Sequence, residues 1–124
     1  MKRIILDTNF LIDIMRFKID IEEIKGIIDG PYRILTISPV IDELKKIAKK
    51  KTKESKNAKI VLKLIKSKRI EVLKSKGKYT DDVILNLVDK NTIVATNDKK
   101  LRKKLKRLGT KTIYLRAKKY LAIS

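Results

Sequence analysis

Two aspartates follow short apolar segments that have the pattern of buried strands. Asp7 comes directly after residues 2–6, and Asp98 comes two residues after 93–96. In a parallel sheet the carboxyl ends of the strands meet at one edge and ligands bind beyond it, so both carboxylates are expected there. Each has a simpler role too, because Asp at a helix start caps backbone amides. The placement therefore favours a carboxylate site but leaves two plain helix caps as the alternative.

A third acid lies on the helix predicted over residues 38–51. Glu43 is in line with Val40 and Ile47 on the margin of the apolar face, whereas Asp42 points away from that face. Glu43 is therefore the candidate for an inward carboxylate. The alternative is a Glu at the edge of the core whose stem packs while its carboxylate reaches water.

The helix predicted over residues 81–90 begins with another acidic pair. Asp81 is in line with Ile84 and Val88 and flanks the apolar face, while Asp82 projects on the opposite side. We expect Asp81 to be the inward ligand and keep Asp82 as a further helper. Acids in a first turn also stabilise the helix dipole, and for Asp82 this is the favoured interpretation.

The composition restricts the chemistry that these acids could perform. The chain has no Cys and no His, which excludes disulfides, thiolate nucleophiles, imidazole acid/base pairs and the usual zinc sites. Carboxylates that converge repel one another unless a cation lies between them. One or two Mg²⁺ or Mn²⁺ ions would suit such oxygen ligands and phosphodiester hydrolysis. The predicted ligands are Asp7, Glu43, Asp81 and Asp98, with Asp82 as the helper.

The formal net charge of +19 indicates an anionic partner, and nucleic acid is the first candidate. We predict phosphate contacts on the helix over residues 98–108, and the alternative is a solvated basic face with the RNA path along residues 45–68. No apolar run approaches the roughly 20 residues that span a bilayer, so we expect no membrane association and a cytoplasmic protein. The predicted RNA contacts are Lys99, Lys100, Arg102 and Lys103.

Strand and helix patterns alternate along the chain. Strands are predicted at residues 2–6, 32–36, 70–73, 93–96 and 112–115, and helices at 10–15, 19–28, 38–51, 54–67, 81–90 and 98–108. Strands separated by helices imply a parallel sheet covered on both faces. The predicted fold class is α/β, a three-layer α/β/α sandwich around a central parallel sheet of roughly five strands. One domain over residues 1–124 is expected from the length.

Four sequence pieces, at residues 4–9, 38–44, 80–84 and 93–98, occur in an order and spacing that resemble the PIN-domain nucleases. The resemblance extends over nearly the whole chain. It implies a PIN-like fold and a metal site from the same four acids, Asp7, Glu43, Asp81 and Asp98. It also implies supporting polar contacts from Thr8, Asn9, Thr96 and Asn97.

Residues 77–82 and 94–101 look most like the Fcf1/Utp24 branch of that family, which is associated with ribosomal RNA processing. Thr80, where a small Ala often precedes the acidic pair, and a short turn at residues 89–92 depart from the pattern. The resemblance implies a metal-dependent endoribonuclease in which a water molecule attacks the scissile phosphate in line. A ribosome-assembly partner would fit this branch, and a homodimer is expected from the family alone.

Three alternatives stay open. A VapC-type toxin would use the same chemistry on tRNA or rRNA and would bind a small antitoxin. A non-catalytic RNA- or ribosome-binding module would keep the fold with a degenerate site, but all four acids are present. A phosphate-receiver domain also gathers acids at a sheet edge, but the ordered motifs fit it poorly.

Overall fold

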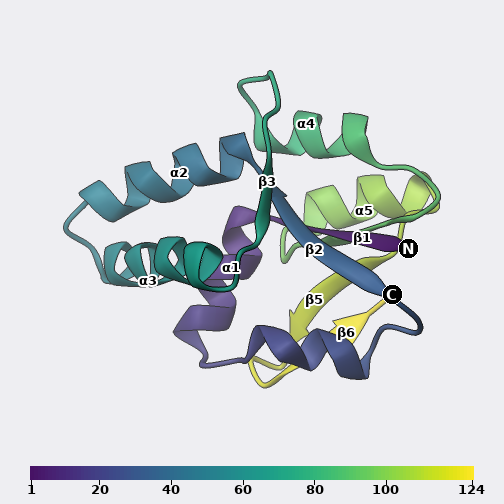
Figure 1. Ribbon diagram of the computed structural model, residues 1–124, viewed down its shortest axis with the longest axis horizontal. Coiled ribbons are helices and arrows are strands. Elements are labelled where there is room, and N and C mark those ends of the chain that lie inside the picture. The colour runs from purple at the N-terminus through teal and green to yellow at the C-terminus, as the bar shows by residue number, and fades with distance from the viewer.

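A six-stranded sheet in the order β3-β2-β1-β4-β5-β6 forms the centre of the molecule. The computed structural model describes residues 1–124 (Figure 1). Neighbouring strands are parallel except β5 and β6, which form an antiparallel pair. The strands are β1 (Lys2–Leu6), β2 (Tyr32–Ile37), β3 (Glu71–Leu73), β4 (Thr92–Ala95), β5 (Thr112–Arg116) and β6 (Tyr120–Ile123).

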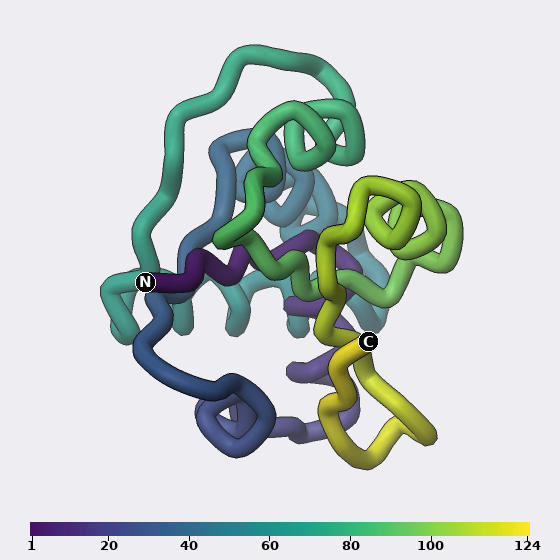
Figure 2. The backbone as a smooth tube through the Cα atoms, turned by 90° about the vertical axis from the view of Figure 1, so that its right-hand side faces the viewer, coloured from purple at the N-terminus to yellow at the C-terminus, as the bar shows by residue number.

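Helices cover both faces of the sheet, and α4 and α5 lie on the side opposite the 3-10 segment η1 (Figure 2). The predicted α/β sandwich is therefore confirmed. α2 and α3 pack against each other as a hairpin at one end of the molecule (Figure 1). The helical elements are α1 (Thr8–Arg16), η1 (Ile21–Gly26), α2 (Ser38–Lys49), α3 (Lys53–Ser67), α4 (Thr80–Leu87) and α5 (Lys99–Arg107).

Two elements differ from the sequence prediction. The helix expected over residues 19–28 is the short 3-10 helix η1, whose buried residues Ile21 and Ile24 are three apart, the period of a 3-10 turn. The strand β6 was not predicted. Ala117 and Lys118 both have positive φ, 54° and 55°, and form the turn that reverses the chain after β5. That conformation is usually signalled by Gly or Asn, and neither occurs there.

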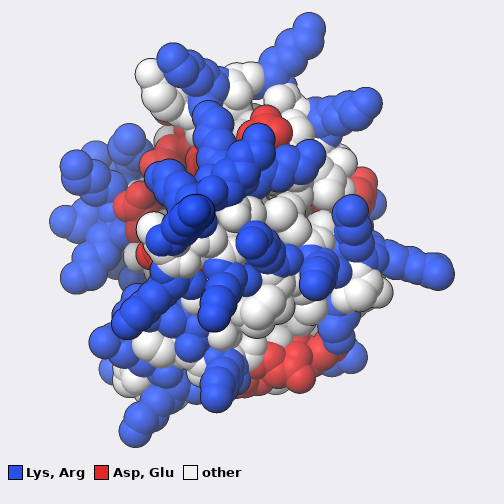
Figure 3. Space-filling model, turned by 90° about the vertical axis from the view of Figure 1, so that its left-hand side faces the viewer, with Lys and Arg blue, Asp and Glu red and all other residues white.

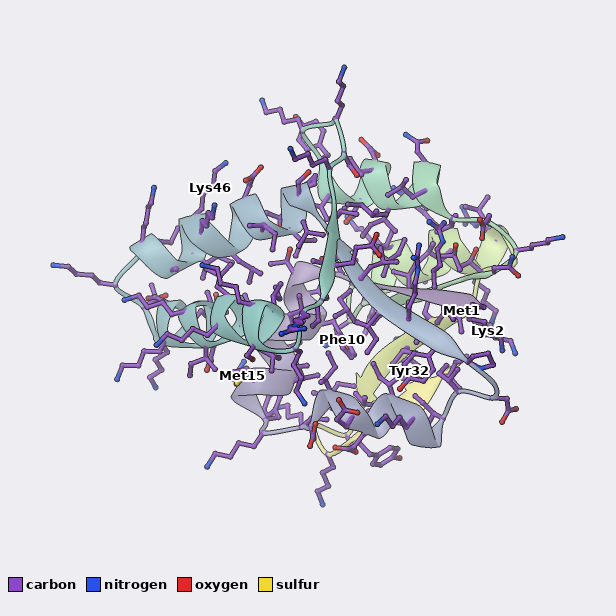
Figure 4. All side chains as sticks on the ribbon, in the orientation of Figure 1. Met1, Lys2, Phe10, Met15, Tyr32 and Lys46 are labelled. Atoms are coloured by element: carbon purple, nitrogen blue, oxygen red, sulfur yellow. The ribbon has the colours of Figure 1, made fainter.

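The core is built around the central strand β1, where Ile4, Ile5 and Leu6 are fully buried. Phe10 on α1 lies in the interior, whereas Lys46 projects from the outer side of α2 (Figure 4). Both faces of β1 are covered, which accounts for its continuous apolar sequence. None of the helices is long and apolar enough to cross a membrane.

Candidate active site

Asp7 is buried where β1 passes into α1. The register that pairs Leu6 with Ala95 brings Asp7 beside Thr96 on the neighbouring strand end. The Oδ1 atom accepts a hydrogen bond from the Thr8 backbone N–H at 2.8 Å, and Oδ2 accepts one from the Thr96 hydroxyl at 2.7 Å. Asp7 is thus a helix cap and a fixed carboxylate at the sheet edge at once.

Burial raises the pKa of Asp7 to about 6. The two hydrogen bonds, from Thr96 and Thr8, oppose this shift because they stabilise the charged form, and the negative charges of Asp81 and Glu43 add to it. Asp7 is only 3% exposed and makes no ion pair. A nearby cation would remove most of the cost of its charge.

The segment from Thr96 to Asp98 connects β4 to α5 and holds the second acid. Asp98 caps α5, since its Oδ1 accepts hydrogen bonds from the N–H groups of Lys100 and Leu101 at 2.9 and 3.3 Å. The Thr96 hydroxyl, which donates to Asp7, accepts from the Asp98 backbone N–H at 3.2 Å. Thr96 therefore connects the two aspartates.

Asn9 and Asn97 brace this junction. The Asn9 Oδ1 accepts from the Asn97 backbone N–H at 2.9 Å. The Asn97 side chain donates to Asp13 at 2.8 Å and accepts from the Leu115 N–H, also at 2.8 Å. These contacts hold α1, the β4–α5 connection and β5 together. The supporting role of Asn9, Thr96 and Asn97 at a metal site stays a prediction. The hydroxyl of Thr8 is buried without a hydrogen-bond partner.

The other two acids come from α2 and α4. Thr80, the first residue of α4, is buried and its hydroxyl donates to Glu43 Oε1 on α2. Asp81 is the next residue of α4. Burial raises its pKa, and the negative charges of Asp98, Glu43 and Asp82 raise it further, while the positive charge of Lys104 lowers it. A sequence-distant hydrogen bond therefore holds the start of α4 against α2.

One cavity of about 310 Å³, here called the acidic cavity, is lined by all four predicted acids. Asp82 does not line it, in agreement with the helical geometry that separates it from Asp81. Two further acids that the sequence did not indicate, Asp13 and Glu54, also border the cavity. Its lining is Asp7, Thr8, Asn9, Ile12, Asp13, Glu43, Ile47, Glu54, Thr80, Asp81 and Asp98.

The donor set of the acidic cavity fits a hard divalent ion by its chemistry, because it offers carboxylate and hydroxyl oxygens and no nitrogen or sulfur ligand of the zinc type. The arrangement is not that of a closed metal site: no three acidic side chains are near enough to one another to hold one ion in common. Mg²⁺ usually keeps several water ligands and needs only one or two carboxylates from the protein, so this spacing is compatible with an open site. The roles of these acids stay predictions.

The chain is similar to proteins of one known family. The family described as a PIN-like domain matches residues 4–118. Ribonuclease VapC4 of Methanocaldococcus jannaschii is 35% identical, over 99% of this chain and 97% of the relative. The PIN-domain endonuclease Utp24 has a similar structure, with a TM-score of 0.81 and 28% identity over 98% of this chain and 90% of that one.

Two more distant structures share the fold alone. A domain of a functionally unknown protein from Methanocaldococcus jannaschii has a TM-score of 0.62 and 20% identity, over 94% of this chain and 93% of that one. VapBC-1 from nontypeable Haemophilus influenzae has a TM-score of 0.51 and 19% identity, over 85% and 93%. The family match over most of the chain and the relative that is 35% identical end to end show that this protein belongs to the PIN-like domain family.

Proposed function

We propose that this protein is a Mg²⁺- or Mn²⁺-dependent endoribonuclease whose reaction takes place in the acidic cavity. The observation that carries the proposal is the convergence of Asp7, Glu43, Asp81 and Asp98 from four separate segments, in a chain of net charge +19. An acidic centre in a basic protein suits a metal that meets a phosphate. The ribonuclease VapC4 and the endonuclease Utp24, both similar over nearly the whole chain, support a ribonuclease activity.

The residues of the chain have distinct roles in this proposal. Asp7, Glu43, Asp81 and Asp98 would hold one or two divalent ions, which supply positive charge to stabilise the phosphate as it is attacked and the leaving oxygen departs. Thr96 fixes the orientation of Asp7 and braces Asp98 through its N–H. Asn97 holds Asp13 at the margin, and Thr80 holds Glu43.

Removal of the metal tests the proposal directly. We expect the purified protein to cleave single-stranded RNA with Mg²⁺ or Mn²⁺ and to lose that cleavage in EDTA. Attack by water, with the 3′ oxygen as leaving group, gives a 5′-phosphate and a 3′-hydroxyl. Attack by the RNA 2′-hydroxyl, as in metal-independent ribonucleases, gives a 2′,3′-cyclic phosphate instead. Cleavage by the wild type that persists in EDTA or leaves cyclic ends, and that Asp7→Asn abolishes, would refute the proposal; the same cleavage in both preparations would reveal a contaminating enzyme.

Thr80 is a positioning residue in this scheme, and its loss has a predictable effect. Thr80→Val keeps the shape of the side chain but removes the donor to Glu43 Oε1. A hydrogen bond to a charged group contributes about 1.5–3 kcal/mol, so Glu43 should become mobile and bind the ion less well. We expect the Mg²⁺ concentration for half-maximal cleavage to rise by roughly tenfold.

Thr80→Ser is the matched control because it retains the hydroxyl. Its metal requirement should stay close to that of the wild type. If Thr80→Val lowers the rate equally at all Mg²⁺ concentrations, or Thr80→Ser behaves like Thr80→Val, then Thr80 acts through packing and not through Glu43.

The biological role has two candidates with the same chemistry. The resemblance of residues 77–82 and 94–101 to the Fcf1/Utp24 branch favours ribosomal RNA processing with a ribosome-assembly partner. The similarity to ribonuclease VapC4 favours a toxin ribonuclease with an antitoxin partner. Either role fits a cytoplasmic protein, and a homodimer stays an expectation from the family. Expression in a heterologous host separates the two: a toxin should arrest growth as the wild type but not as Asp7→Asn, whereas equal growth favours RNA processing.

A further inference from the structure

The helix α5 carries an unusual density of unpaired positive charge. Seven of its nine residues, KKLRKKLKR, are Lys or Arg, and none of them takes part in an ion pair. Like charges three or four residues apart destabilise a helix by roughly 0.2–0.5 kcal/mol per pair. Lys99 and Lys100 also lie at the positive end of the helix dipole. Such a helix is most stable with an anion bound to it.

Four of the seven cations of α5 line one cavity. A cavity of about 280 Å³, here called the α5 cavity, lies beside the helix and has no hydrophobic lining residue. Thr110 and Thr112 line it, and both are more than nine-tenths buried. The predicted contact Lys100 does not line this cavity, and Lys106, which was not predicted, does. The full lining is Lys99, Arg102, Lys103, Lys106, Thr110, Thr112 and Ser124.

Arg102 is the fixed member of this group. Its guanidinium carbon lies 3.6 Å from the centroid of the Tyr114 ring on β5, and its Nε is buried with no hydrogen-bond partner. Stacking on the ring sets the plane of the guanidinium before a ligand arrives, so less rotamer entropy is lost on binding. A planar donor of this kind recognises phosphate oxygens better than a flexible ammonium group does.

The linings of the two cavities include successive residues at the start of α5. Asp98 lines the acidic cavity, and the next residue, Lys99, lines the α5 cavity. We propose that the α5 cavity binds a phosphodiester of the RNA strand that neighbours the one in the acidic cavity, with Arg102 as its preorganised donor. This inference rests on the proposed function. In this proposal the RNA passes from the acidic cavity along α5. It does not pass over the lysine-rich turn between α2 and α3, where basic side chains crowd the surface (Figure 3).

Binding measured without cleavage tests the inference. A fluorescein-labelled oligouridylate of about 12 nucleotides, in the size range of such grooves, is titrated in EDTA at several salt concentrations. We expect Arg102→Ala to weaken binding by about tenfold. The fall of log affinity with log salt should become less steep by about 0.7, the value for one phosphate contact on a single strand. Arg102→Lys should keep the slope but weaken binding, because the charge stays while the stacked plane is lost.

Arg107→Ala is the matched control, since it removes the same charge from the same helix outside the α5 cavity. We expect it to weaken binding by less than about threefold. Equal effects of Arg102→Ala and Arg107→Ala would overturn the inference and leave only general attraction to a basic helix. Thermal unfolding of each variant checks that the fold is kept.

The kind of phosphate is decided by a second pair of probes. The same oligouridylate with and without a 5′-terminal phosphate should bind equally if the α5 cavity takes an internal phosphodiester. Binding that requires the terminal phosphate would overturn that assignment. Arg102-dependent binding by a protein that cleaves no RNA would refute the proposed function but support this inference, whereas cleavage with no Arg102-dependent binding would do the reverse.

Discussion

Asp7→Asn is expected to lower the rate of RNA cleavage by about 10³-fold while the protein stays folded. Asn is as good a helix cap as Asp, so its side-chain oxygen can still accept from the Thr8 N–H. It carries no negative charge, however, and cannot neutralise a divalent ion. Single-turnover cleavage at saturating Mg²⁺ measures the loss, and circular dichroism confirms the fold.

The neighbouring acids Asp81 and Asp82 provide an internal control for this experiment. Asp81→Asn and Asp82→Asn change the net charge equally and at successive positions of α4. Only Asp81 lines the acidic cavity. Asp81→Asn should cost about 10²-fold or more, and Asp82→Asn less than about threefold. Equal losses from the two variants would mean that the acidic cavity is not the reaction centre.

The four predicted acids line one cavity, and two signals in the sequence account for this. Asp7 and Asp98 follow strands that are neighbours in the sheet, so parallel topology alone brings them to one edge. Glu43 and Asp81 were chosen by helical periodicity, which correctly separates Asp81 from Asp82. Both signals are local to one element, and both concern elements whose type was predicted correctly.

The features of the site that were not predicted from the sequence mostly depend on contacts between distant segments. Glu54 reaches the acidic cavity because the α2–α3 hairpin folds back, and Thr80 meets Glu43 across 37 positions of sequence. Asp13 could have been found, since it lies four residues after Asn9 on the same face of α1. Lys106 could also have been found in place of Lys100, because Lys99, Lys103 and Lys106 follow the i, i+4, i+7 spacing of one helical face.

Helix capping and site formation are not competing roles in this protein. Asp7 accepts the Thr8 N–H on Oδ1 and the Thr96 hydroxyl on Oδ2, and Asp98 caps α5 through Oδ1 alone. The cap fixes each carboxylate relative to the end of its strand. A helix start at the sheet edge is therefore what orients the acids, and the Oδ2 of Asp98 is the oxygen left for another ligand.

Stability should reveal the cost of this arrangement. Burial raises the pKa of Asp7 from its ordinary value of 3.8 to about 6, so the folded protein at neutral pH holds a charge in an environment that disfavours it. Each pKa unit corresponds to about 1.4 kcal/mol, which gives about 3 kcal/mol as the upper bound of this penalty. We expect Asp7→Asn to increase the free energy of unfolding of the metal-free protein by about 1–3 kcal/mol at neutral pH.

The pH dependence of this difference follows from proton linkage. Between pH 3.8 and about 6 the folded wild type binds more protons at Asp7 than the unfolded chain does. Its free energy of unfolding therefore falls as the pH rises through this window and stays low above it. Asp7→Asn has no titratable group at this position. The difference in the free energy of unfolding between the two proteins should therefore be small near pH 3.8 and reach its full size above about pH 6. Urea unfolding in EDTA at both limits, at constant salt, measures it.

Mg²⁺ should remove this difference in stability. An ion that binds the folded wild type at about 100 times its dissociation constant adds about 2.7 kcal/mol to the free energy of unfolding, because it binds only the native state. Asp7→Asn should gain little, since one ligand is missing. We therefore expect the variant to be the more stable protein in EDTA and to lose that advantage in Mg²⁺. A variant that is less stable than the wild type in EDTA would show that Asp7 stabilises the fold through its hydrogen bonds, and that its burial is not maintained for metal binding.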